Sequence, residues 1–333
     1  MAGLRDASAV RPTPTSKPSL PAYAELHCLS AFSFQRGAST ALELFERAKA
    51  LGYRALAITD GCSFAGLVRG LEASEATGLP LICGTEVQLA DGPKLVLLIE
   101  SLRGYETLSA LITTARRRAA KGAYALHRAD LDAAFGGAAG EGDDGEPCGV
   151  LALWIPTLLG DEAEVAAWLR ALFPDRLWLA AQLHRGADDD ARRAAIDALA
   201  TRCGLPVVAC GDVHMHVRRR RGLQDVLCAL RHRCTLREAG RRLFANGERH
   251  LRTRQALAAI FPRAWLEESV AIAARCRFSL RDLKYAYPRE LVPEGETPSS
   301  WLARCTWEGA ALRWPEGVPE KVRAQIDAEL VLI

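Results

Sequence analysis

The sequence lacks a Cys-x-x-Cys pair, although it contains ten cysteines. The cysteines are scattered singly, many of them in apolar stretches, as Cys83, Cys210 and Cys228 illustrate. Paired cysteines mark zinc ribbons and redox motifs, and regularly spaced even sets mark small disulfide-linked secreted domains. The scattered pattern therefore argues against both classes and predicts free thiols in the reducing cytoplasm.

Long apolar runs are missing as well. No stretch of the sequence approaches the roughly 20 apolar residues needed to cross a bilayer, so we predict no membrane-spanning segment and no membrane partner. Residues 1–22 are rich in Pro, Ser, Thr and Ala and lack the apolar core of a signal peptide. We expect these residues to form a flexible N-terminal tail of a cytoplasmic protein.

The excess of positive charge is small, at a formal +3 for 333 residues, and does not by itself indicate a nucleic-acid-binding protein. The basic residues are nevertheless clustered, in Arg116–Arg118, in Arg218–Arg221, in the group Arg231, Arg233, Arg237, Arg241 and Arg242, and in Arg249–Arg254. Such runs usually form solvated faces, but several of them beside one site can also contact phosphates. Both interpretations stay open at this stage.

What the sequence does contain is a regular alternation of short apolar runs and amphipathic stretches, joined by short connections. This alternation predicts β/α units in a parallel sheet. So many units in about 200 residues favour a closed or nearly closed parallel β/α barrel over an open sheet, with a mostly helical C-terminal segment beyond Arg218. The predicted strands lie at residues 23–29, 55–59, 79–86, 94–100, 150–155, 177–183 and 205–211.

Metal-binding residue types stand at the ends of these predicted strands. In β/α folds the carboxyl ends of the strands carry the functional groups, so these side chains should meet at one face of the barrel. Carboxylates and imidazoles without thiolates suit zinc, manganese or iron, and such clusters activate water for phosphate hydrolysis. The predicted ligands are His27, Asp60, Glu86, His184, Asp212 and His214.

The residues around these positions resemble the PHP (polymerase and histidinol phosphatase) domain. More closely, the sequence from Tyr23 onward resembles the N-terminal part of the error-prone branch of the bacterial C-family DNA polymerases. The resemblance implies a distorted β/α barrel with a multinuclear metal site, assigned here to residues 23–285. The stretches that carry it are 24–39, 57–60, 183–186, 211–216 and 291–298.

The sequence departs from the metal-competent family pattern at three places. Leu29 stands where the first motif has its second histidine, Gly61 where the second motif has a histidine, and Trp154 where the family can carry a further ligand. One or two metals on the remaining residues is one interpretation. The other is a vestigial site in which Asp60, Glu86 and Asp212 serve hydrogen bonds and helix caps.

The C-terminal residues resemble the entry to a polymerase palm. We assign residues 286–333 to a linker and the start of that palm, and the apolar ending Leu330–Ile333 suggests that the last helix packs against chain beyond it. The Mg²⁺-binding carboxylates of nucleotidyl transfer would then lie outside this chain, which alone would not polymerise DNA.

The main hypothesis is therefore an error-prone DNA polymerase used in translesion synthesis and damage-induced mutagenesis. The resemblance implies a primer–template and deoxynucleotides as substrates, and a sliding clamp and accessory mutagenesis proteins as partners. A second hypothesis is a metal-dependent phosphoesterase or 3′→5′ exonuclease acting through the PHP site. A third is a non-catalytic PHP module that buttresses the polymerase and contacts DNA or protein through residues 218–254.

Overall fold

The structure is a computed structural model, and it describes residues 19–136, 148–160, 162–284 and 292–333. The chain divides into two compact units, Met1–Leu283 and Lys284–Ile333. The N-terminal tail expected for residues 1–22 lies mostly outside the described residues. Among those described, no helix is long and apolar enough to cross a membrane.

One six-stranded sheet organises the first unit, in the order β1-β2-β3-β4-β5-β6. The pairs β1–β2, β4–β5 and β5–β6 are parallel, whereas β3 runs antiparallel to both of its neighbours. The predicted fold class is confirmed, but the prediction of a wholly parallel sheet is wrong at this strand. The strands are β1 (Leu56–Ile58), β2 (Leu81–Gln88), β3 (Lys94–Ile99), β4 (Val150–Ile155), β5 (Leu177–Ala181) and β6 (Val207–Ala209).

The antiparallel strand follows from a short connection. Only residues 89–93 join β2 to β3, and a parallel crossover needs a dozen residues or more. Leu89 closes this hairpin by donating its backbone N–H to the Pro93 carbonyl, at 3.2 Å. The hairpin brings Lys94 beside the end of β2, where it becomes part of the candidate site.

The segment 23–29 joins the two edges of the sheet. Its Glu25 makes a parallel bridge to Leu56 in β1, and its Cys28 makes another to Val213, just past β6. The backbone N–H groups of Leu29 and Val213 donate to the carbonyls of Val213 and His27, at 2.8 and 2.9 Å. The sheet therefore curls into a distorted barrel, and this segment carries His27 to its centre.

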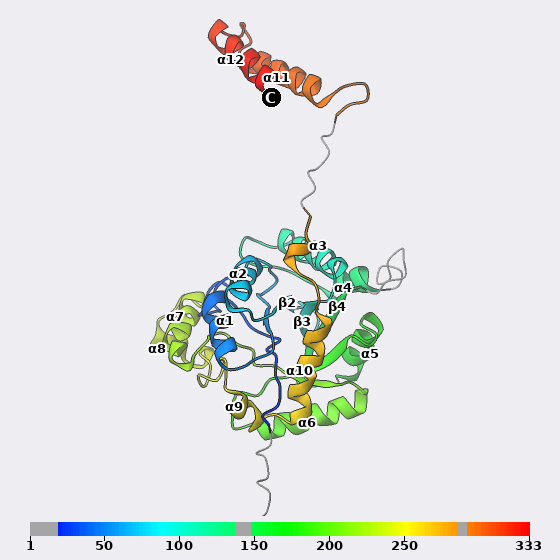
Figure 1. Cartoon of the computed structure of the whole chain (residues 1–333), viewed down its shortest axis with the longest axis vertical. Helices are drawn as coiled ribbons and strands as arrows, with labels where there is room; N and C mark the ends of the chain where they lie inside the picture. The colour runs from blue at the N-terminus through cyan, green and yellow to red at the C-terminus, as the bar shows by residue number, and fades with distance from the viewer. Residues whose placement is uncertain (1–18, 137–147, 161, 285–291) are drawn as a thin grey trace, which may run out of the picture. The chain divides into compact units, whose positions relative to one another are not determined.

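Side chains alternate between the two faces of the sheet along each strand. Both faces are buried, because each packs in an apolar cluster. Leu56 and Ile58 enter a large apolar cluster that also contains residues of the helices from α1 to α6. Ala57 and its neighbours on the other face pack in a smaller cluster with Ile272 of α10, the long helix that crosses the sheet in Figure 1. The helices of this part are α1 (Ala41–Ala50), α2 (Leu67–Thr77), α3 (Leu102–Arg117), α4 (Arg128–Phe135), α5 (Ala163–Leu172), α6 (Asp189–Cys203) and α10 (Arg263–Arg275).

Beyond residue 218 the described chain is mostly helical, as predicted. Many of these helices start at a side-chain cap; Thr235, for example, forms a capping box with Glu238 at the start of α8. The remaining helices of the first unit are α7 (Arg221–Arg231), α8 (Leu236–Ala239) and α9 (Arg254–Ala258), and those of the second unit are α11 (Pro298–Arg313) and α12 (Glu320–Leu332).

Candidate metal centre and its relatives

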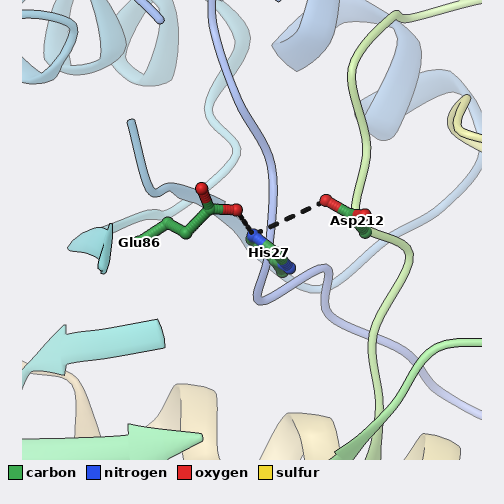
Figure 2. A group of neighbouring side chains, drawn as sticks. All are labelled: His27, Glu86 and Asp212. Atoms are coloured by element: carbon green, nitrogen blue, oxygen red, sulfur yellow. Dashed lines mark hydrogen bonds and ion pairs between the residues drawn. The ribbon is translucent and has the colours of Figure 1, made fainter. Parts of the chain in front are cut away.

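His27 lies at the centre of the candidate site and is fully buried. Its Nε2 is 2.8 Å from Oε2 of Glu86, and its Nδ1 is 2.9 Å from the amide nitrogen of Gln182 (Figure 2 shows the contact with Glu86). Because the Gln182 amide N–H donates to Nδ1, the proton of the neutral imidazole sits on Nε2 and is donated to Glu86. Burial lowers the pKa of His27 to about 4, so the ring is neutral at pH 7.

Glu86, on β2, is almost fully buried and has two cationic partners. Arg36 Nη1 donates to Oε1 at 2.6 Å, and Lys94 Nζ lies 2.7 Å from Oε2. Burial raises the pKa of this carboxyl, but the hydrogen bond from His27 and the charges of Lys94 and Arg36 outweigh burial and hold the pKa well below its usual value. Glu86 is therefore a carboxylate whose charge the protein itself neutralises.

Asp212 follows β6 in a left-handed backbone conformation, with φ of 45°. Its Oδ1 lies 3.7 Å from His27 Nε2 and 3.2 Å from His214 Nε2, and Arg249 forms an ion pair with its other oxygen. Among the described residues, one group of metal-binding side chains has its ligand atoms within 4.8 Å of one another: His27, Glu86 and Asp212. The structure thus brings together three of the six predicted ligands.

Asp60 lies outside this three-residue group and makes the kind of hydrogen bonds that the second interpretation gave it. This buried carboxylate accepts hydrogen bonds from the backbone N–H of Ser30 at 2.9 Å, from the Ser30 hydroxyl at 2.7 Å and from the Ser33 hydroxyl at 2.6 Å. It therefore fixes the loop that follows His27. Burial raises its pKa, and the hydrogen bonds from Ser33 and Ser30 oppose that rise.

The two other predicted ligands bind protein atoms. His184 donates from Nε2 to the Gly211 carbonyl, 3.0 Å away, and is outside the three-residue group. His214 contacts Asp212 through Nε2, and its ring packs edge-on against Phe244. Burial lowers the pKa of His184 to about 2 and that of His214 to about 3, so both rings are neutral.

The positions that depart from the family pattern are filled by other groups. A Cβ added at Gly61 would lie 3.0 Å from Nη1 of Arg36, so this guanidinium occupies the space into which a side chain at position 61 would project. Leu29 and Trp154 are fully buried apolar residues of the core. Where the family pattern has ligands, this chain has a cation and hydrophobic packing.

The residues present do not fit a divalent metal. Each carboxylate of the group already pairs with one or two cations, which are Arg36 and Lys94 for Glu86 and Arg249 for Asp212. An added divalent ion at this point would face three positive charges at short range. A ligating imidazole also needs a lone pair on the atom that faces the metal, and His27 presents Nε2–H there.

Sequence reasoning missed the three cations and Gln182. One of them, Lys94, left a signal. A hairpin with its turn near Asp91-Gly92 places Lys94 opposite Gln88, as the structure shows, and hence diagonally across from Glu86 on the same face of the ladder. Arg36 and Arg249 come from a loop and from the predicted basic run, and no spacing in the sequence relates them to the site.

A family model described as "PHP domain" matches residues 25–172. The chain is therefore similar to the PHP domain over these residues. The matched range includes His27, Asp60 and Glu86, while Asp212 and Arg249 lie beyond it.

Relatives match over almost the whole chain. It is 57% identical over 312 residues to the error-prone DNA polymerase of Pseudomonas aeruginosa, covering 94% of this chain and 29% of that protein. It is 54% identical over 314 residues to the error-prone DNA polymerase of Xanthomonas oryzae pv. oryzae, covering 94% of this chain and 28% of that protein. The resemblance predicted from the sequence is confirmed over this part of their length, and the chain spans less than a third of these relatives.

Solved structures show weaker similarity. An amidohydrolase from Chromobacterium violaceum aligns with 58% of this chain and 88% of its own, with a TM-score of 0.40 and 18% sequence identity.

Proposed function

We propose that this chain is the PHP-containing part of an error-prone DNA polymerase. The observation that supports the proposal is the 57% identity to such a polymerase across 94% of the chain. The whole protein would add deoxynucleotides to a primer–template with Mg²⁺, in translesion synthesis and damage-induced mutagenesis in the cytoplasm. A sliding clamp and accessory mutagenesis proteins would be its partners.

We assign nucleotidyl transfer to residues outside this chain, because its described carboxylate cluster is neutralised by Arg36, Lys94 and Arg249. In this proposal residues 23–285 form the PHP domain and residues 286–333 the linker and the start of the palm. The same neutralisation disfavours a phosphoesterase or 3′→5′ exonuclease at the PHP site. We propose instead that the PHP domain is a metal-independent structural module of the polymerase.

Primer extension tests the polymerase assignment. A protein of the relatives' full length, carrying this sequence, should extend a primer on a lesion-containing template in Mg²⁺, whereas the 333-residue chain should not. A matched control is the longer protein assayed with chelator in place of Mg²⁺. A folded longer protein without extension activity would contradict the assignment, and so would extension by the short chain.

A further inference from the structure

A hollow of about 620 Å³ opens near the site, and the described residues that line it include five cations and no carboxylate. Its volume lies within the range of ordinary ligand sites. It adjoins a hollow of about 420 Å³ that shares Arg36, Tyr124 and Arg231 with it and reaches Glu86 and Asp212. We call the larger hollow the basic groove; its cations are Arg36, Arg116, Lys121, Arg231 and Arg233.

Of the five cations of the basic groove, Arg36 pairs with Glu86, and the other four form no ion pair among the described residues. Lys121, Arg231 and Arg233 are exposed, and no ion pair joins them to a carboxylate among the described residues. Arg116 donates N–H groups to the carbonyls of Gly61, Cys62 and Ala123 and lies over the ring of Tyr124, and no ion pair joins it to a carboxylate in the described part of the chain. A polyanion would therefore find several phosphate-binding groups on one surface.

The basic run at Arg218–Arg221 behaves differently from the groove. Three of its arginines have acidic partners: Arg218 lies 3.5 Å from Glu248, Arg221 lies 3.5 Å from Asp225, and Arg220 pairs with Glu43. These contacts offset much of the charge that the sequence alone suggested for residues 218–221. The groove thus offers the better site for an anionic partner, although its cations are spread over three segments of the chain.

Aromatic rings stand at the edge of the same groove. Phe34 is 82% exposed and Phe32 is 48% exposed, which is unusual for phenylalanine on a water-facing loop. Both lie in the loop that Asp60 fixes through Ser30 and Ser33. The loop is thus held in place while its rings face solvent, as a stacking platform requires.

We propose that the basic groove binds single-stranded DNA, with Phe32 and Phe34 stacking on bases and Lys121, Arg231 and Arg233 contacting phosphates. Aromatic rings combined with unpaired cations are the usual means of holding unstacked bases on a charged backbone. A duplex hides its bases from such rings, and an acidic peptide makes no use of stacking. The proposal rests on the chemistry of the groove and does not require the proposed polymerase activity.

Fluorescence anisotropy of a labelled oligothymidylate with the 333-residue chain tests the proposal. F32A/F34A should weaken binding by about tenfold or more, because base–aromatic stacking contributes strongly to such affinity. K121Q/R231Q/R233Q should weaken binding and reduce the slope of log affinity against log salt by about two, at roughly 0.7 per phosphate contact on a single strand.

Two matched variants serve as controls. K49Q/R54Q/R202Q removes three exposed cations outside the groove, and L159A truncates an apolar side chain that is 91% exposed. Neither should change the affinity by more than about twofold. Thermal melting of every variant confirms that each one is folded.

Two results would overturn the proposal. One is equal binding by the groove variants and the controls. The other is displacement of the oligonucleotide by polyglutamate as effectively as by unlabelled oligothymidylate, which would assign the groove to an acidic protein partner. Because no primer is extended in this assay, its failure is distinct from failure of the polymerase assignment.

Discussion

Replacing Glu86 with alanine should lower the free energy of unfolding by about 3–5 kcal/mol, the usual cost of removing one partner from a buried ion pair. The substitution leaves the ammonium of Lys94 and the guanidinium of Arg36 without their shared carboxylate. It also removes the hydrogen-bond acceptor of His27. Urea denaturation followed by circular dichroism measures the loss.

The matched control is Glu72→Ala. Glu72 pairs with Arg69 on the surface of α2, with both side chains more than half exposed. Such a pair contributes at most about 1 kcal/mol, so the variant should unfold at nearly the same urea concentration as the parent chain. Equal losses for Glu86→Ala and Glu72→Ala would contradict the view that Glu86 organises the site.

The stability of the chain should fall steeply as the pH drops from about 6.5, the ordinary pKa of a histidine, towards 4, the lowered pKa of His27. Burial lowers the pKa of His27 to about 4, of His214 to about 3 and of His184 to about 2. In the unfolded chain these rings take up protons near pH 6.5, whereas the folded chain excludes the protons. Protons therefore bind preferentially to the unfolded state throughout this window.

Each histidine that stays neutral in the folded chain should lower the free energy of unfolding by roughly 1 kcal/mol for each pH unit of acidification in this range. Glu86 acts in the same direction at lower pH, because its lowered pKa stabilises the folded chain above about 4.5 and that contribution is lost on acidification. Urea midpoints at several pH values give the slope. A flat profile between pH 6.5 and 5 would show that these rings are protonated in the folded chain.

The strands could be predicted from the sequence because each is a short apolar run bounded by turn residues. All seven predicted segments carry β contacts, including 23–29, which forms bridges and not a regular strand. The direction of β3 could not be predicted from periodicity alone, since an apolar run reads the same for parallel and antiparallel pairing. The short connection at residues 89–93 carries that information, because it is too short for a parallel crossover.

The convergence of His27, Glu86 and Asp212 follows from their places next to strands that meet in the barrel. What these side chains contact there could not be predicted in the same way. The partner of Asp212, Arg249, follows it by 37 positions in an irregular segment, and only the folded chain places its guanidinium on the carboxylate. Asp60 illustrates the same limit, because its position at the end of β1 suits a metal ligand and a loop anchor equally well.

The central claim is that cations of the protein neutralise the carboxylates of Glu86 and Asp212 in place of a metal. Elemental analysis of the 333-residue chain, after incubation with Zn²⁺, Mn²⁺ or Fe²⁺ and removal of free ions, tests it most directly. We predict far less than one bound metal per chain and no change in melting temperature on adding a chelator. One metal per chain, lost in both His27→Ala and Glu86→Ala variants that remain folded, would contradict the claim.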